Sequence, residues 1–577
     1  MKDRSASIEK RKALIENGGA KNIRDIIETA EKLYGKKIAF REMAGRVSVS
    51  YTYEDLLHDV NCLGTALYSE GFEEKHIAVI GENSYRWIVS YLASILLGVV
   101  VPIDKEHTAP TVAKLVEKCH ADAILCSKNY YKTSVEASAF SEKHPEIFCW
   151  QNPLDEDEKS FEKLIEKGEK LLENGEKGFI ERKIDSEKMS AILFTSGTTG
   201  ANKGVMLSQK NICANVNSIT KVMPVEETSF SVLPMNHAFE FNCHVLPTIY
   251  FGMELCINSS LKRLLKNLKE FKPAMTVVVP LFVDEIYSAV VAQAKRRGKY
   301  KTMLAAVKIS DFLRSIGIDL RRFFFRELHE NFGGNLSLMV CGGAAINPVT
   351  AGFLESFGID IIPGYGITEC SPLVSIDLSE SKKKNSVGKP VPGVEVCIED
   401  PDPSGIGEIL IKGENVTLGY YEDEESNAVS FTDGWFRTGD YGFIDKNGRI
   451  VITGRKKNLI ILENGKNVHP EEIENIILEN TDYIRDLVVH EKTVEKGSKT
   501  YSCIAATISL MPDSPLALLD EESRIAAVTE DIRKINKKIA AYKQISLIYV
   551  TLDEFEKTTT HKVVRSKAIR EEIYTTV

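Results

Sequence analysis

The sequence predicts an α/β protein with a large N-terminal domain of parallel sheets covered by helices, a β-rich subdomain and a small α+β C-terminal domain. Helical patterns alternate with short β-branched runs through most of the chain, which is typical of parallel sheets with helices on their faces. From Val387 the pattern changes to short alternating strands separated by Gly, Pro and Asn-Gly turns. At 577 residues the chain is too long for one hydrophobic core, so several domains are expected.

Strands and helices are expected to alternate through the first part of the chain. The segment 76–84 has the pattern of a strand followed by a turn, and 121–127 and 274–280 have the pattern of strands that follow helices. The highly charged stretch 153–190 predicts a solvated surface helix and its connection.

The most apolar run of the chain, residues 87–104, could be mistaken for a membrane span. Two serines, Gly98 and Pro102 interrupt it, so its apolar length falls short of the ~20 residues that a bilayer requires. We instead expect a buried helix up to Leu97, a turn at Gly98 and a buried strand that ends at Pro102.

Residues 288–335 are rich in lysine, arginine and phenylalanine and have a helical, amphipathic pattern. The preferred interpretation is a set of packed helices with a basic outer face. Contact with a membrane surface is the alternative, because basic amphipathic helices also bind the lipid interface.

The domain boundaries follow from the change in pattern. We expect an N-terminal domain over 1–454, with the β-rich subdomain near 387–454, and a C-terminal domain over 455–577. The sequence Asp-Lys-Asn-Gly at 445–448 predicts a hairpin turn. In the C-terminal domain, strands are expected around 459–462, 486–490 and 501–510, and helices around 470–480 and 522–540.

Composition excludes some classes of function. The net charge of −9 argues against a nucleic-acid partner, because phosphate binding requires a basic surface. The 11 cysteines are odd in number and none forms a C-x-x-C pair, which argues against a disulfide framework or a metal cluster and favours a reducing compartment. The first residues have no apolar core of the signal-peptide type. We therefore expect a cytoplasmic protein with at most peripheral membrane contact.

The segment FTSGTTGANKGVML, residues 194–207, is the strongest indication of chemistry. Small residues allow backbone N–H groups to approach a phosphate chain, hydroxyl groups add donors, and a lysine adds positive charge. The pattern is not that of a P-loop, because no glycine stands directly before Lys203; a flexible polar loop is the simpler alternative. The candidate nucleotide-binding residues are Thr195, Ser196, Gly197, Thr198, Thr199, Gly200 and Lys203.

The same segment resembles the signature loop of the adenylate-forming (AMP-binding) superfamily, and the chain is most similar to the long-chain fatty acyl-CoA synthetases of that family. The family usually has a proline where this chain has Asn202. Four further motifs follow in the family's order: PGYGITECSP at 363–372, DGWFRTGDYG at 433–442, ITGRKKNLI at 452–460 and EKTTTHKVVRSK at 556–567.

The resemblance implies roles for individual residues of the nucleotide site. Thr195 and Glu369 would hold Mg²⁺, Tyr365 would stack on the adenine base, and Asp440, assisted by Arg455, would bind the ribose hydroxyl groups. The remaining nucleotide-site residues that the motifs supply are Gly364, Gly366 and Thr368.

The C-terminal domain is implied to be a mobile lid. Its Lys562 would be catalytic, because a cation is needed between a carboxylate and the α-phosphate of ATP, which repel one another. The family has a glycine where this chain has His561. The lid would rotate about Lys457, and Gly465 would leave room for the pantetheine arm of coenzyme A.

The acyl site is implied by two further segments, 231–242 and 340–348. His237 would border the substrate carboxylate and, with Lys562, Thr195 and Glu369, belongs to the expected catalytic set. The expected acyl-binding residues are His237, Phe239, Gly342, Gly343 and Ala344.

The function implied is a two-step ligase. A carboxylate and ATP would form acyl-AMP and pyrophosphate with Mg²⁺, and the acyl group would then pass to the thiol of coenzyme A. The expected acid is a medium- or long-chain fatty acid. The alternatives are an acyl carrier protein as acceptor, an aryl acid as substrate, or a non-catalytic lipid- or nucleotide-binding relative.

Overall fold

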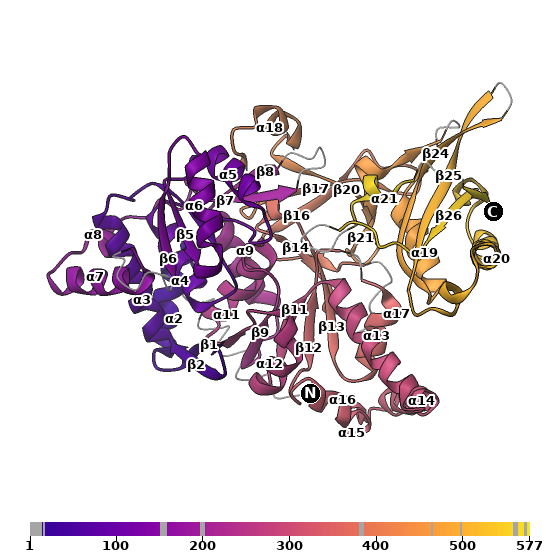
Figure 1. The fold of residues 1–577 in the computed structure, drawn as a ribbon, viewed down its shortest axis with the longest axis horizontal. Coiled ribbons are helices and arrows are strands. Elements are labelled where there is room, and N and C mark those ends of the chain that lie inside the picture. The colour runs from indigo at the N-terminus through magenta and orange to yellow at the C-terminus, as the bar shows by residue number, and fades with distance from the viewer. Residues whose placement is uncertain are drawn as a thin grey trace.

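The computed structural model describes residues 14, 18–150, 159–196, 202–344, 346–379, 386–462, 466–496, 499–557, 563–570 and 574–577. In Figure 1 two helix-covered sheets form the N-terminal part, and the C-terminal part lies beside them at the opposite end of the molecule from the N-terminal helices. The predicted α/β class is confirmed.

The first sheet has seven strands in the described part of the chain; the five at one side of it run parallel, and the two at the other side pair in antiparallel fashion. The expected helix and strand of the apolar run are found as α4 (Tyr85–Leu97) and β4 (Val99–Pro102). Helix α4 begins where the Ser84 side chain accepts a hydrogen bond from the backbone N–H of Trp87. The strands, in sheet order, are β18 (Gly419–Tyr420), β8 (Asn202–Ser208), β7 (Met189–Ser196), β4 (Val99–Pro102), β3 (His76–Ile80), β5 (Ala123–Ser127) and β6 (Glu146–Trp150).

Helices cover both faces of this sheet, as its buried, apolar strands require. The charged stretch that was expected to be a surface helix contains α7, whose apolar residues Phe161 and Leu164 are buried. The helices are α3 (Tyr53–Ser69), α4 (Tyr85–Leu97), α5 (Ala109–Lys118), α6 (Tyr131–Phe140), α7 (Phe161–Glu173), α8 (Gly178–Glu181) and α9 (Gln209–Val222).

The second sheet has nine strands among the described residues, six of them parallel. Two antiparallel strands extend the β13 edge and one extends the β1 edge. Its strands, in order, are β15 (Lys389–Pro390), β14 (Leu373–Ile376), β13 (Asp360–Gly366), β12 (Leu338–Cys341), β11 (Met275–Val278), β9 (Thr228–Ser231), β10 (Glu254–Ile257), β1 (Ile38–Ala44) and β2 (Val47–Thr52).

The helices of the second sheet include the basic, phenylalanine-rich region, which is helical as expected but begins earlier, at Pro280. In Figure 1, α13 leads away from the sheet to α14, which lies at the lower edge of the molecule. The helices are α2 (Ile23–Tyr34), α10 (Ala238–Glu240), α11 (Leu246–Tyr250), α12 (Leu264–Phe271), α13 (Pro280–Arg296), α14 (Tyr300–Ser315), α15 (Arg321–Phe324), α16 (Arg326–Asn331) and α17 (Pro348–Ser356).

The β-rich subdomain is an antiparallel sheet with one short helix. The predicted hairpin at Asp445–Gly448 joins its two last strands: Asp445 accepts hydrogen bonds from the backbone N–H groups of Asn447 and Arg449. The elements are β16 (Val394–Glu399), β17 (Gly407–Gly413), α18 (Glu424–Ser430), β19 (Phe431–Thr432), β20 (Trp435–Ile444) and β21 (Ile450–Arg455).

The C-terminal part has a hydrophobic core of its own, formed by buried residues between Ile460 and Ile548. The two expected helices are present, whereas the strand expected at 486–490 is much longer and two final strands were missed. The elements are β22 (Ile460–Ile461), β23 (Asn467–Val468), α19 (Pro470–Asn480), β24 (Ile484–Lys496), β25 (Lys499–Leu510), α20 (Glu521–Asn536), β26 (Leu547–Thr551), α21 (Arg565–Ala568) and β27 (Thr575–Thr576).

No helix among the described residues is long and apolar enough to cross a lipid bilayer.

Candidate functional site

The predicted site residues gather where the parallel strands of both sheets end. Thr195 lies at the end of β7, His237 follows β9, Gly342 follows β12, and Tyr365 lies near the end of β13. The carboxyl ends of parallel strands are the usual location of ligands in open α/β sheets. Asn83, which follows β3, joins the two sheets: its amide accepts from the N–H of Met235 and donates to a nearby carbonyl group.

The glycine- and threonine-rich segment connects two antiparallel strands. Strand β7 continues to Ser196, and Thr195 is directly opposite Lys203 on β8. Lys118 at the end of α5 donates a hydrogen bond of 2.7 Å to the carbonyl oxygen of Asn202. The positive charge at the base of this segment therefore comes from two lysines. Gly197, Thr198, Thr199 and Gly200 lie outside the described residues.

Tyr420 brings the predicted lysine and the predicted magnesium ligand together. Its hydroxyl group donates a 2.8 Å hydrogen bond to Oε1 of Glu369, and Nζ of Lys203 lies 4.8 Å from the centre of its ring. Burial, with the Glu369 carboxylate as the next cause, raises the pKa of Tyr420, so this hydroxyl keeps its proton and remains a donor. Strand β18 places Tyr420 here by pairing with β8.

The turn that carries Glu369 is held by the same segment of chain. The N–H of Thr417 donates to the carbonyl oxygen of Glu369 at 2.8 Å, and the Asn415 side chain donates to that of Cys370. Thr368, another predicted residue, begins this turn. The carboxylate of Glu369 is thus fixed relative to β8 by both side-chain and backbone contacts.

Asp440 is the centre of a second cluster. It is 3% exposed; its Oδ2 accepts a 2.5 Å hydrogen bond from the hydroxyl group of Tyr365, and its Oδ1 lies 2.8 Å from Nε of Arg455. Strands β20 and β21 place Asp440 directly opposite Arg455. The motifs implied separate roles for Tyr365 and Asp440, but in the structure the two side chains bind one another.

The glycines around Tyr365 lie close to other parts of the protein's own backbone. A Cβ atom at Gly366 would lie 2.3 Å from the carbonyl oxygen of Pro372, which no side chain tolerates. That carbonyl group accepts from the N–H of Ile367, closing the bend between β13 and β14. Gly364 lies on β13 opposite Ile376. The need for glycine at 366 therefore comes from this bend, whatever binds beside it.

The predicted acyl site lies between the two sheets. His237 is 30% exposed and its Nε2 is 3.9 Å from Oδ2 of Asp104, a buried carboxylate that follows β4. Phe239 lies against the backbone of Gly342, where a Cβ atom would be 2.8 Å from its ring. The room that Gly342 leaves is thus occupied by Phe239 itself. Gly343 and Ala344, the next predicted residues, are exposed.

The last residue of β21 and the residues directly after it contact three neighbouring elements, β20, β17 and α19. Arg455 binds Asp440, Lys456 binds Glu408 of β17 at 2.6 Å, and Asn458 donates to Glu471 of α19. Lys457, the expected hinge, has a pKa that is lowered by partial desolvation and then by the nearby positive charge of Arg455.

The terminal motif is anchored by an arginine. Both terminal nitrogens of Arg565 bind the Glu474 carboxylate, at 2.7 and 3.0 Å, and one also donates to the carbonyl oxygen of Val489. Lys557 and Val563 form a β-bridge on either side of the segment that contains Lys562. Lys562 and Gly465 themselves lie outside the described residues.

The side chains described above have the chemistry needed to bind a magnesium–nucleotide complex. Glu369 and Thr195 offer hard oxygen ligands, and Mg²⁺ in nucleotide sites is held by one or two carboxylates together with substrate phosphates. In the described ranges no cluster of three or more His, Cys, Asp or Glu could hold a metal ion by itself. The two lysines near Asn202 and the buried acceptor Asp440 complement phosphates and a sugar diol, respectively.

Comparison with known proteins decides the family. The AMP-binding enzyme family matches residues 27–421, and the C-terminal domain of AMP-binding enzymes matches residues 457–575. The chain belongs to the AMP-binding enzyme family. The sequence-based assignment to this superfamily is confirmed, and the protein is an adenylate-forming ligase of the acyl- and aryl-CoA ligase group. Such AMP-binding enzymes use ATP, Mg²⁺ and coenzyme A, as the motifs predicted.

The relatives of this AMP-binding enzyme differ in the acids and acceptors they are named for. The long-chain-fatty-acid–CoA ligase FadD15 of Mycobacterium bovis is 27% identical, over 76% of this chain and 75% of the relative. A chloroplastic long-chain-fatty-acid–[acyl-carrier-protein] ligase, AEE15 of Arabidopsis thaliana, is 26% identical over 79% of this chain and 72% of its own. The crystal structure of the anthranilate CoA ligase AuaEII with anthranoyl-AMP has a TM-score of 0.72 at 20% identity, covering 95% of this chain and 96% of that one.

Sequence reasoning missed several site residues. Tyr420, Asn83, Asp104 and Lys118 stand in segments without a motif of their own. Tyr420 follows a glycine just after the strand 407–413, and Asn83 and Asp104 follow buried strands. Polar residues directly after buried parallel strands were the available signal.

Proposed function

We propose that this AMP-binding enzyme is a two-step fatty acyl-CoA ligase. The convergence of Lys203, Tyr420 and Glu369 on one side and of Asp440, Tyr365 and Arg455 on the other supports it most directly. Each cluster joins the end of a parallel strand to an element of the β-rich region, so that one nucleotide can be held at its phosphates and at its ribose.

In the first step a carboxylate oxygen of the acid forms a bond to the α-phosphorus of ATP, and the bond to the bridging oxygen breaks to release pyrophosphate. Lys203 and Lys118 hold positive charge beside the phosphates, which lowers the repulsion between the two anions. Mg²⁺, held by Glu369 and Thr195, would neutralise further phosphate charge. Asp440 orients the ribose by accepting its hydroxyl protons.

In the second step the sulfur of coenzyme A forms a bond to the acyl carbon and AMP leaves. The proposed lid, 455–577, would turn about Lys457 between the steps, bringing Lys562 to the site for the first and Gly465 for the second. The contacts of Lys456 and Asn458 on either side of Lys457 support a pivot here, because they fix the two flanks while Lys457 itself makes the turn.

The acid is proposed to be a medium- or long-chain fatty acid. The fatty-acid ligases among the relatives support this, and so does the apolar character of Phe239 beside Gly342. An acyl carrier protein is the alternative acceptor, and an aryl acid the alternative substrate, because relatives and structural neighbours are named for both.

Phe239→Ala should improve the relative rate with long or bulky acids, since it empties the space in front of Gly342.

Pyrophosphate release over a panel of carboxylic acids, with coenzyme A, with a pantetheinylated carrier protein and with neither, tests the proposal. Release that requires fatty acids of at least medium length, with thioester formed on coenzyme A, is the expected result. Release with benzoate-type acids alone would reject the fatty-acid substrate. Absence of release with every acid, together with an unchanged melting temperature in ATP, would reject an ATP-binding ligase altogether.

Lys562 gives a second test. Lys562→Ala should slow formation of acyl-AMP while thioester formation from supplied acyl-AMP continues, because the lysine is needed only while charge develops on the α-phosphate. Equal loss of both partial reactions would show that Lys562 has another role. His561→Ala, which shortens the adjacent side chain where the family has a glycine, serves as the matched control and should leave both partial reactions nearly unchanged.

A further inference from the structure

Exposed apolar side chains are concentrated on α14 and the residues that follow it. Of the 24 large apolar side chains that are exposed in the described chain, eight lie between Leu304 and Phe324. Phe312 is 66% exposed and Phe323 77%. Monomeric soluble proteins rarely expose such groups side by side without a binding partner.

Helix α14 is apolar on two faces, and the protein covers only one of them. Met303, Ala306 and Val307 pack against the hydrophobic core below the second sheet. Ile309, Phe312 and Ile316, spaced three and four residues apart, form a stripe on another face and are exposed. The stripe is therefore not needed to hold the helix in place.

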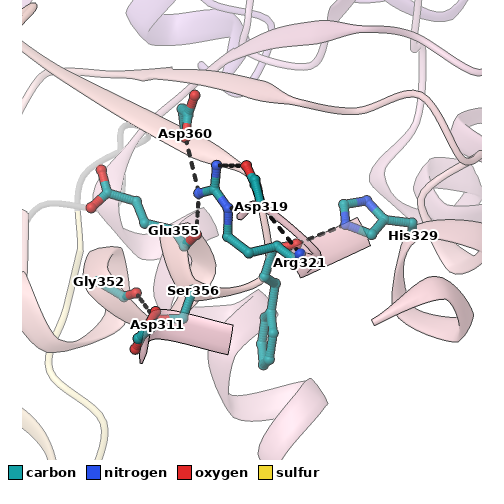
Figure 2. Close-up of polar contacts among 9 residues, drawn as sticks. Asp311, Asp319, Arg321, His329, Gly352, Glu355, Ser356 and Asp360 are labelled. Atoms are coloured by element: carbon teal, nitrogen blue, oxygen red, sulfur yellow. Dashed lines mark hydrogen bonds and ion pairs between the residues drawn. The ribbon is translucent and has the colours of Figure 1, made fainter. Parts of the chain in front are cut away.

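Polar contacts fix the exposed residues in position. Figure 2 shows Arg321 bound to Asp319, to the carbonyl oxygen of Glu355 and to Asp360. The Arg321 guanidinium lowers the pKa of Asp319 to about 2, so this pair stays charged at neutral pH.

Two further contacts attach the same region to α17. The hydroxyl group of Ser356 donates to Asp311 of α14. Phe325, directly after the exposed Phe323 and Phe324, is buried against Phe357 with ring centres 4.4 Å apart. The apolar side chains thus project from a rigid base rather than from a loose loop.

The charge of this region is opposite to that of the whole protein. Residues 295–326 contain ten lysines and arginines and two aspartates, a net charge of +8 in a chain of net charge −9. Lys301 and Lys308 are exposed on α14 beside the apolar stripe. A surface that is both apolar and strongly basic complements the anionic lipid–water interface.

We propose that α14, the turn 316–320 and α15 form a docking surface for an anionic lipid bilayer; we call these residues the tip surface. Phe312, Ile316 and Phe323 would enter the acyl boundary while the flanking lysines contact lipid phosphates. A second copy of the chain fits less well, because pairing two tip surfaces, each of net charge +3 and flanked by further basic residues at 295–299, would bring like charges together.

The tip surface lies apart from the proposed acyl site. Helix α13 starts next to Val279, which is near Gly343, and its 17 residues span about 25 Å before α14 begins. Docking would therefore concentrate the enzyme at a surface where long-chain acids collect, and the chemistry in solution would not depend on it.

Sedimentation of the full-length protein with vesicles tests the proposal. We expect binding to phosphatidylcholine vesicles that contain phosphatidylglycerol, weaker binding to phosphatidylcholine alone, and release at high salt. Phe312→Ser combined with Phe323→Ser should weaken binding at least about tenfold, since each ring loses apolar burial in the interface. Lys301→Glu combined with Lys308→Glu should weaken it by at least about tenfold, as each basic residue near an anionic surface contributes about fivefold.

Matched changes elsewhere provide the controls. Phe140→Ser with Leu518→Ser removes apolar groups of similar exposure, and Lys132→Glu with Lys446→Glu makes the same change of charge; both should leave vesicle binding unchanged. Pyrophosphate release with a soluble medium-chain acid, measured without vesicles, should be the same in all variants, which separates this proposal from the ligase function.

Three results would overturn the proposal. One is equal binding by the tip variants and their controls. Another is a protein that does not bind anionic vesicles at all. The third is a dimer or larger oligomer that light scattering detects in the unaltered protein and in the controls but not in the tip variants. That result would identify the tip surface as an interface between copies of the chain.

Discussion

At the scale of single residues, Tyr420 is the side chain whose importance is most visible in the structure and least visible in the sequence. Its hydroxyl group holds Glu369, and its ring lies against Lys203. A hydrogen bond to a charged group is worth about 1.5–3 kcal/mol, which corresponds to roughly ten- to a hundredfold in rate.

Tyr420→Phe should therefore lower the rate of ATP–pyrophosphate exchange at least about tenfold and raise the Mg²⁺ concentration needed for half-maximal rate. The ring remains, so Lys203 keeps its neighbour. Tyr421→Phe, which changes the tyrosine directly after the strand, where its ring lies near those of His76 and His120, should have little effect. An unchanged magnesium dependence in Tyr420→Phe would show that Glu369 does not hold the metal ion.

Asp440 carries the second prediction at this scale. Asp440→Asn should weaken ATP binding at least about tenfold in calorimetric titration, because the ribose diol and Arg455 lose a charged acceptor. Thermal stability should change little, since an amide oxygen can still accept from Tyr365. Tyr365→Phe, which leaves the carboxylate in place, should weaken ATP binding less. Equal affinity for Asp440→Asn and the unaltered protein would place the ribose elsewhere.

At the scale of elements, the C-terminal motif depends on a buried ion pair between α21 and α19. Burial raises the pKa of Glu474 and the Arg565 guanidinium opposes that shift. Glu474 also accepts from the N–H of Val489, which ties α19 to β24. Removing one partner of such a pair leaves an uncompensated buried charge, which costs about 3–5 kcal/mol.

Arg565→Met should therefore accelerate amide hydrogen exchange in β24 and in α19 by a factor of about a hundred or more. Arg565→Met combined with Glu474→Gln should recover most of the protection, because the amide needs no counter-charge and still accepts from Val489. Exchange in β3 and β5 of the first sheet should stay the same in both variants. If the double variant were as labile as the single one, the charge of Glu474 would not be the cause.

The elements also show what the sequence could and could not predict. Strands and helices with clear periodicity, such as α4 with β4 or α19, were predicted to within a few residues. Strands β26 and β27 were missed because they are short and are defined by pairing with β25 and with one another. The motif residues of the candidate site could be proposed from the sequence because their family pattern is local.

Tyr420 could not be found in this way. Its strand joins the first sheet by contacts such as that between Thr417 and Met206, which are 211 residues apart in the chain. Nothing local to a Gly-Tyr-Tyr run indicates a partner so distant. Gly366 shows the opposite difficulty: the sequence predicted it as a nucleotide-site residue, but the backbone of Pro372 already explains why it is glycine.

At the scale of the whole molecule, buried histidines make the stability of the C-terminal part depend on pH. Burial lowers the pKa of His469 and of His490 below the ordinary value of 6.5. The unfolded chain then binds more protons than the folded one once the pH falls below about 6.5. Their stabilising contribution is complete above that pH and is lost as the pH falls toward the folded-state pKa.

The melting temperature should accordingly fall between about pH 7.5 and about pH 5, and His490→Gln should make that dependence shallower. Each such histidine changes the free energy of unfolding by at most about 1.4 kcal/mol per pH unit. His58→Gln removes a histidine that is half exposed and should leave the slope unchanged. A slope that is the same in all three proteins would show that other groups control the acid sensitivity.

The strand pairing around Tyr420 has a consequence for any attempt to divide this protein. Strand β18 is the edge strand of the first sheet, but in the chain it lies beyond Val387, where the sequence pattern changes. A fragment that stops at residue 386 would lose β15 from the second sheet and β18 from the first. It would expose the backbone groups of Gly204 and Met206 on β8 that residues 418–421 now pair with, and such open edges recruit other chains. The lysine on that strand would also lose its aromatic neighbour. The nucleotide half of this enzyme is therefore not a separable module, and an N-terminal piece produced by proteolysis or a premature stop should precipitate rather than bind ATP.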